Sequence, residues 1–283
     1  MDDTIITVLM VTARALHYGA ALVLFGYAVF KGLLLREARD ETPVARAAAV
    51  VFGVSTVLWL GAEAANAGDG LPDAVNPQVL WDLLTSTGFG HAWTLQIIFA
   101  FVLLLCGTWL KPLGLVSGLS LIALGWLGHA VMFEGALDIA VPVTQAIHLL
   151  AGGFWLGGLA AIALRPRQMT GGWRDGLIQF STIGHFAVGA VVLSGAGIGY
   201  TLLLMQTGPW NPAYVSLLTV KVIVVIAMAS FALYNRYRLV PQLSKSPAAQ
   251  QQLMRNVRLN LLLSGAVVLL VSTLGQLSPS IDQ

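Results

Sequence analysis

The chain has 283 residues, of which 57% are hydrophobic and only 10% are charged, and its formal net charge is +2. Because a soluble domain carries roughly 25% charged residues, this composition excludes an ordinary soluble protein. The small net charge gives no reason to expect a nucleic-acid partner, and the single cysteine, Cys106, excludes disulfides and cysteine-rich metal sites. The composition therefore predicts a polytopic membrane protein in contact with lipid.

Eight apolar segments follow one another, and each approaches or exceeds the roughly 20 residues that a helix needs to cross the hydrocarbon core. A tight turn is predicted at Lys111-Pro112, and a short interfacial helix is predicted at about Pro77–Thr85. The pattern predicts an all-α fold: a polytopic membrane helix bundle with eight transmembrane helices. The segments lie at about Ile5–Leu35, Val44–Ala65, His91–Leu110, from the turn to Phe133, Val141–Leu164, Leu177–Met205, Ala213–Leu239 and Val257–Leu277.

Basic loops alternate with acidic or neutral loops along the chain. The first loop contains Arg36, Arg39 and Arg46, whereas Asn66–Gly90 contains aspartates and neither Lys nor Arg. The alternation continues to the last segment, and the positive-inside rule then places both termini outside. We therefore expect a single transmembrane domain, residues 1–283, in a bacterial inner membrane with its acidic loops facing the periplasm.

A short internal repeat relates the first and fifth segments. His17 and His148 each follow an alanine by two residues and precede a glycine by nine, Gly26 in the first segment and Gly157 in the fifth. Both segments run from outside to inside, so the similarity favours two parallel four-helix halves, as some transporters show. The halves would be residues 1–134 and 141–283.

Histidine is costly in hydrocarbon and usually marks a ligand, a proton path or a satisfied polar contact. All five histidines lie within or at the edge of apolar segments, and four of them fall on the outer side. Imidazole binds copper, haem iron and zinc, and thioether prefers Cu(I). Met132 follows His129 by three residues on one helical face, so the sequence predicts an outer metal site. Its candidate ligands are His91, His129, Met132 and His148.

A haem is the alternative use of the same side chains. Bis-His ligation needs two imidazoles on facing helices, and both His17 and His148 precede runs of small residues that would give a macrocycle room. His129 and His185 are further candidates, and Lys221, deep in the seventh segment, would bind an anionic group such as a haem propionate. The plain interpretation is that the histidines are packing residues of a structural or assembly protein, with Lys221 in a structural pair.

Four stretches in the C-terminal half carry a family resemblance. They are HLLAGGFWLGGLAAIAL at His148–Leu164, FSTIGHFAVGAVVLSGAGIGY at Phe180–Tyr200, LLTVKVIVVIAMASFALYNRYRLVPQL at Leu217–Leu243 and LMRNVRLNLLLSGAVVLLVSTLGQLSP at Leu253–Pro279. In this order they resemble the copper resistance D (CopD/PcoD-like) family of bacterial inner-membrane proteins. GHA at Gly128–Ala130 and ARALH at Ala13–His17 extend the resemblance toward the N-terminus.

The resemblance implies an eight-helix protein of copper homeostasis, often considered an importer of copper across the inner membrane. Transport or delivery would take copper from the outer ligands to inner ones, for which His185, Cys106 and Met228 are the candidates. For some relatives it implies b-type haem and electron transfer, so the alternative is a haem-dependent membrane oxidoreductase that reduces Cu(II) or oxidises quinol. The expected partners are a periplasmic copper-binding protein and, in the alternative, a quinone; no side chain is expected to be catalytic.

Overall fold

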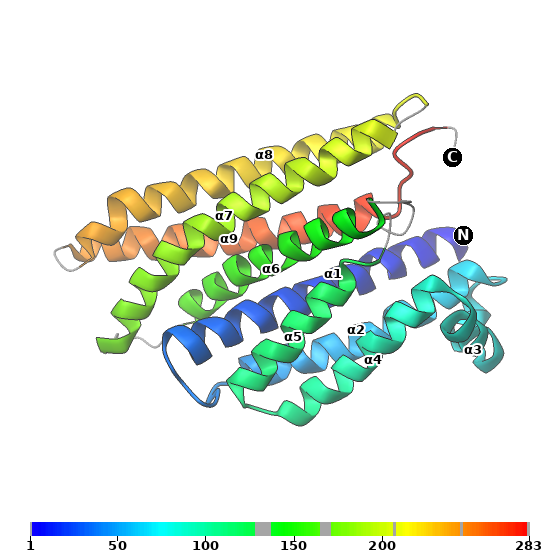
Figure 1. Ribbon diagram of the computed structural model, residues 1–283, viewed down its shortest axis with the longest axis horizontal. Helices are drawn as coiled ribbons and strands as arrows, with labels where there is room; N and C mark the ends of the chain where they lie inside the picture. Colours follow the sequence, from blue (N-terminus) through cyan, green and yellow to red (C-terminus); the bar gives the residue numbers. More distant parts are fainter. Residues whose placement is uncertain (1, 128–136, 165–170, 206–207, 244–245, 282–283) are drawn as a thin grey trace.

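The computed structural model describes residues 2–127, 137–164, 171–205, 208–243 and 246–281. These residues form an all-α bundle, which confirms the predicted fold class (Figure 1). Short π-helical turns, Phe30–Leu34 and Asn235–Leu239, continue the first helix and the eighth. The α-helices are α1 (Asp2–Val29), α2 (Val44–Ala67), α3 (Pro77–Ser86), α4 (Gly88–Cys106), α5 (Leu110–Leu124), α6 (Leu137–Ala163), α7 (Gly171–Met205), α8 (Pro212–Tyr234) and α9 (Pro247–Leu274).

Seven of these helices are long and apolar enough to cross a membrane. α5 is apolar but has only 15 residues, and the end of the predicted fourth segment falls in 128–136, outside the described residues. The count of eight crossings therefore stays a prediction. Both ends of the chain lie at the same end of the bundle (Figure 1).

Two predicted boundaries, the start of the last helix and the turn before α5, were wrong. The short helix predicted at about Pro77–Thr85 is found as α3. α9 begins at Pro247 rather than near Val257, because the Ser246 side chain caps it by accepting from the Ala249 N–H. Hydropathy marks only the apolar part of this helix, whose first turns are polar. The turn before α5 lies at Gly107, with φ +61°, and not at Lys111-Pro112. Pro112 lies in the first turn of α5, where a backbone N–H would have no acceptor within the helix, so proline is tolerated there.

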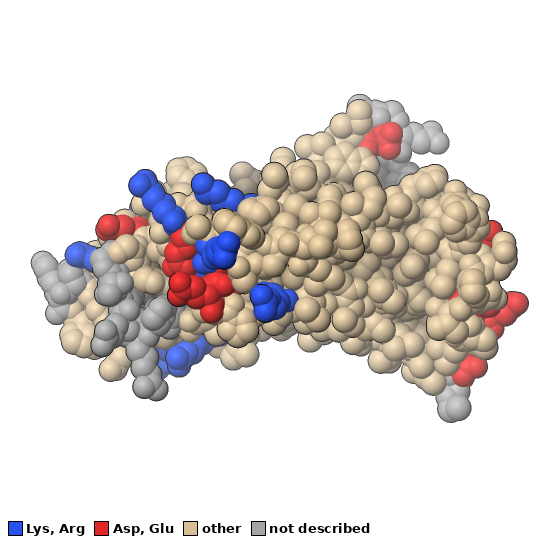
Figure 2. Space-filling model, turned by 90° about the horizontal axis from the view of Figure 1, so that it is seen from below, with Lys and Arg blue, Asp and Glu red and all other residues tan. Residues whose placement is uncertain are grey.

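α1 runs through the middle of the molecule, with α2, α4 and α5 on one side and α6 to α9 on the other (Figure 1). On the face seen in Figure 2, Lys and Arg gather toward the end opposite the termini. At the end near the termini, the charged residues visible on this face are all acidic. This is the distribution that the positive-inside rule associates with external termini.

The centre of the bundle is a crossing of α1 and α6 at glycines. A Cβ atom placed on Gly157 would lie 2.6 Å from Cα of Gly26, and one placed on Gly26 would meet the carbonyl oxygen of Gly153. These neighbours are backbone atoms that cannot move aside, so only glycine permits this approach. Small residues let membrane helices pack through backbone contact in this way.

A buried ion pair fixes the first loop beneath α1. Nζ of Lys31 lies 2.9 Å from Asp40 and 2.9 Å from Glu37. Asp40 also accepts hydrogen bonds from the Tyr27 hydroxyl, from Thr42 and from the Ala45 N–H. Burial alone would raise the pKa of Asp40, but these donors hold it below its usual range. From the sequence, the charges of this loop were interpreted only as a sign of membrane topology, and the ion pair between Lys31 and Asp40 was not predicted.

A second polar contact joins the two ends of the chain. Nη1 of Arg14 on α1 donates to the carbonyl oxygen of Gly275, just beyond α9, at 3.0 Å. Its guanidinium also lies over the Trp59 ring, 5.1 Å from the centroid. A cation is favourable there because the carbonyl end of a helix carries partial negative charge.

Candidate functional site

Each half of the bundle contains a histidine that is hydrogen-bonded to a serine of the following long helix. Nδ1 of His17 on α1 lies 3.2 Å from Oγ of Ser55 on α2. Nδ1 of His148 on α6 lies 2.9 Å from Oγ of Ser194 on α7. The two pairs occupy equivalent places in the two halves of the predicted repeat.

The serine partners determine where the proton of each imidazole sits. Ser194 donates its only hydroxyl proton to the carbonyl oxygen of Ala190, and Ser55 donates its own to that of Phe52. With the serine proton on the helix carbonyl, the serine oxygen accepts, and Nδ1 of each histidine is assigned as the donor. The lone pair is therefore on Nε2 in both His17 and His148. A ring held through Nδ1 with Nε2 free is the arrangement found in metal-binding histidines.

The surroundings of the two rings differ. His17 is fully buried, in contact with Phe52 at 4.3 Å between ring centroids, Trp93 at 5.0 Å and Trp59 at 5.7 Å. Its Nε2 makes no hydrogen bond, although the Gln96 side chain is near the ring. The aromatic packing seals this imidazole from both lipid and water, so it has no route for an ion.

His148 is less enclosed than His17, since its side chain is only partly buried. A Cβ placed on Gly195 of α7 would lie 3.3 Å from the His148 ring, so this glycine keeps space beside the imidazole. Lys221 of α8 is close enough to His148 for their charges to interact. Lys221 makes no hydrogen bond or ion pair with any residue that the structure describes. The predicted structural pair of Lys221 is therefore not found there.

The remaining predicted ligands do not gather around His148 in the described ranges. His91 is exposed at the start of α4, with Nε2 3.2 Å from the carbonyl oxygen of Thr85. His129 and Met132 lie outside the described residues. Cys106 ends α4 in the N-terminal half, whereas Met228 is buried on α8. Between 2 and 281, gaps aside, no three His, Cys, Asp or Glu side chains are grouped closely enough to hold a metal ion.

A haem does not fit between His17 and His148. The His17 ring contacts side chains of α2 and α4, whereas the His148 ring contacts α7, so the two imidazoles do not face each other. Tight aromatic packing fills the space beside His17, and the glycine crossing of α1 and α6 brings backbones into contact between the two helices. Three of the small residues that follow the two histidines, Gly26, Gly153 and Gly157, form this helix crossing instead.

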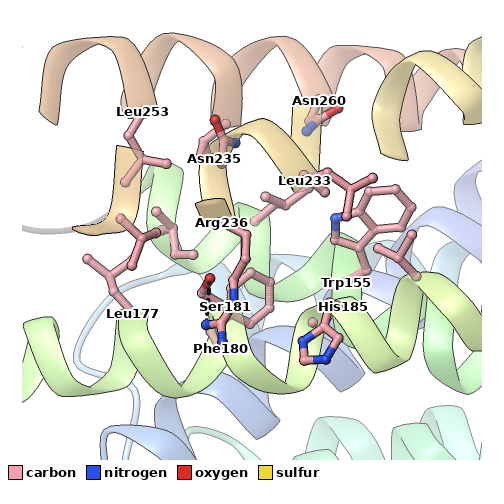
Figure 3. A pocket seen from close by; sticks show the side chains of 17 residues that line it. Trp155, Leu177, Phe180, Ser181, His185, Leu233, Asn235, Arg236, Leu253 and Asn260 are labelled. Carbon is pink, nitrogen blue, oxygen red and sulfur yellow. Dashed lines mark hydrogen bonds between the residues drawn. The ribbon is translucent and has the colours of Figure 1, made fainter. Parts of the chain in front are cut away.

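His185 lies in a different place, at a cavity of about 80 Å³ between α6, α7, α8 and α9 (Figure 3). Nδ1 of His185 is buried and has no hydrogen-bond partner among the described residues. Asn260 of α9 is 0% exposed, and neither its amide nitrogen nor its amide oxygen has such a partner. Arg236 also lines the cavity and donates to the hydroxyls of Ser181 and Thr182.

His185 was predicted as a site residue from the sequence. Asn260, Arg236 and the serine partners of the histidines, Ser55 and Ser194, were not predicted. Asn260 could have been noticed as an amide inside an apolar segment, but Arg236 was treated only as a topology signal. Ser55 and Ser194 carry no signal, because serine is common in membrane helices and only the fold shows its partner.

Comparison with known proteins gives two family matches in chain order. Residues 1–139 match the family described as copper resistance protein D-like, N-terminal domain, and residues 174–274 match copper resistance protein D. Inner membrane protein YebZ of Escherichia coli K12 is 29% identical, covering 95% of this chain and 98% of the relative. Copper resistance protein D of Pseudomonas syringae pv. tomato is 26% identical, covering 97% and 98%. Copper transport protein CutJ of Bacillus subtilis 168 is 29% identical over 74% of this chain and 42% of the relative. No solved structure matches significantly.

Proposed function

Since the chain belongs to the copper resistance protein D-like family and is a multi-pass protein of the inner membrane, we propose that it transports or delivers copper and that His148 receives the ion. The copper-related names of the relatives support the metal, and the geometry of His148 supports the residue. Copper is the cargo in this proposal and not a resident cofactor.

The observation that carries the proposal is the His148 ring, which is hydrogen-bonded to Ser194 through Nδ1, while no described residue is hydrogen-bonded to its Nε2. Ser194 fixes Nδ1 as the donor, Gly195 leaves space beside the ring, and the ring is partly accessible. A neutral imidazole nitrogen held in this way is a good ligand for Cu(I). With the termini outside, His148 lies in the outer half of α6, so the ion would arrive from the periplasmic side, from a separate copper-binding protein.

His148→Gln tests the proposal, with His17→Gln as the matched control. Glutamine can keep a hydrogen bond to the serine but removes the imidazole nitrogen. We expect Cu(I) affinity of the purified protein, measured by competition with a Cu(I) chelator, to fall at least tenfold in His148→Gln. The same affinity should be unchanged in His17→Gln, because that ring is sealed. Unchanged affinity in an inserted His148→Gln protein would exclude His148 as the receiving ligand.

A further inference from the structure

The cavity between α6, α7, α8 and α9 contains two buried side chains with unmet hydrogen-bonding capacity. Asn260 offers two amide protons and one carbonyl oxygen, and His185 offers Nδ1, and none of these has a partner in the described part of the chain. Leaving such groups unpaired in a low-dielectric interior costs roughly 1–3 kcal/mol each. A buried amide without partners therefore indicates that something else makes its hydrogen bonds.

The lining restricts what that molecule can be. Most of the wall is apolar, with Trp155 and Phe180 on it, and Figure 3 shows Asn260 above and Phe180 and His185 below. The wall contains the cation Arg236 and no acidic residue, which disfavours a metal ion, and His185 alone supplies an imidazole. The unpaired Asn260 amide is neutral and offers both donors and an acceptor, which fits a neutral ligand with oxygen atoms.

Size and position narrow the class further. A volume of about 80 Å³ corresponds to roughly five to eight water positions at 10–15 Å³ each, which suits one substituted ring. The cavity is open on one side, and Leu233, which lines it on α8, is 48% exposed on the lipid-facing surface. A ligand of this kind can enter from the membrane.

We propose that this cavity binds the ring of a membrane-soluble quinone or hydroquinone. A ring oxygen accepts from the Asn260 amide, and a hydroquinone hydroxyl donates to Nδ1 of His185 or to the Asn260 oxygen. Trp155 and Phe180 flank the ring, and its isoprenoid chain leaves past Leu233 into lipid. The site is separate from His148 and goes beyond the copper function.

The test is a titration of quinone-depleted protein in detergent with ubiquinone carrying one isoprenoid unit, followed by tryptophan fluorescence. We expect saturable quenching, part of which is lost in Trp155→Phe. Asn260→Leu should weaken binding at least tenfold, the change expected when one or more buried hydrogen bonds are lost. Ser264→Ala is the matched control, since Ser264 is a buried polar residue one turn further along α9 outside the cavity, and it should bind normally.

A second variant and a second ligand keep the outcome unambiguous. His185→Phe should also weaken binding if Asn260→Leu fails to fold, and His148→Gln should leave binding unchanged whatever it does to copper affinity. The proposal is overturned if no saturable quenching occurs, if Asn260→Leu and His185→Phe bind as the wild type does, or if phosphatidylglycerol binds there in preference to the quinone.

Discussion

Gly26 of α1 and Gly157 of α6 are in backbone contact, and each lies nine residues after a histidine that is hydrogen-bonded to a serine. The predicted repeat pairs these same two glycines, one from each half. The division into halves at 1–134 and 141–283 stays a prediction. The two halves differ in the exposure of this histidine, since His17 is fully buried and His148 is only partly buried.

Gly157→Ala should destabilise the bundle strongly. The new methyl group would meet the backbone of Gly26 and Tyr27 at 2.5–2.7 Å, so α1 and α6 must separate. We expect a loss of about 3 kcal/mol, in the upper part of the usual range for point mutations. Thermal unfolding in detergent measures it. Gly152→Ala, on the same helix with no atom within 4 Å of the added carbon, should be neutral or stabilising. Equal behaviour of the two variants would contradict the crossing.

Ser194→Ala should weaken copper binding while leaving the ligand itself in place. Without the Ser194 hydroxyl, the His148 ring loses the side chain that holds its orientation through Nδ1. Removal of such a supporting group typically costs 10–100-fold in metal affinity. Competition with a Cu(I) chelator measures the change. Ser55→Ala, which removes the equivalent partner of His17, should leave copper affinity unchanged. A reduced affinity in both variants would point to a general loss of structure.

Lys221→Met should strengthen copper binding at His148. Lys221 is close enough to His148 for their charges to interact, and it has no partner among the described residues, so a protonated Lys221 would oppose a bound cation. Removing this like charge should tighten Cu(I) binding by roughly three- to tenfold, since charges interact strongly where water is scarce. The same chelator competition decides the point. Weaker binding in Lys221→Met would mean that Lys221 supports the copper site in another way.

Asp40→Asn should destabilise the protein at neutral pH. The substitution removes the carboxylate that pairs with buried Lys31, although Glu37 remains as a second partner. We expect a loss of about 3 kcal/mol, the lower end for breaking a buried pair. Thermal unfolding in detergent measures it. Asp73→Asn is the control, because Asp73 is only partly buried, has no ion pair among the described residues and makes hydrogen bonds that are local to Asp69 and Asn76; it should change stability little.

The same pair predicts the response to acid. Because folding lowers the pKa of Asp40, its contribution is complete above the ordinary carboxyl pKa of about 3.9 and is lost as the pH falls below that value. Unfolding curves of the wild type and Asp40→Asn should therefore differ at pH 7, and the difference should shrink as the pH falls through the lowered pKa of Asp40 in the folded protein. A difference that persists at the lowest pH would show that the carboxylate charge is not responsible.

Much of the fold was predictable from the sequence because apolar length and loop charge follow directly from the membrane. Both ends of the first segment, of α2 and of α3 were predicted within a few residues. For α7, the C-terminal end at Met205 was predicted correctly, and the N-terminal end was not. The start of α9 was missed because its first turns lie outside the apolar part of the chain. The site was less predictable. The histidines could be named, but which of them share a cavity, face a serine or are sealed depends on helix rotation, which hydropathy does not report.

The hydrogen bond between Arg14 and Gly275 has a consequence for synthesis of the protein. α1 leaves the ribosome well before α9, whose end supplies the acceptor of Arg14. Until α9 is inserted, the guanidinium must be satisfied by lipid head groups or water at the surface, as long cationic side chains near helix ends can be. The central helix therefore reaches its final position only after α9 has been inserted, so a chain cut off before α9 would insert but not finish assembling.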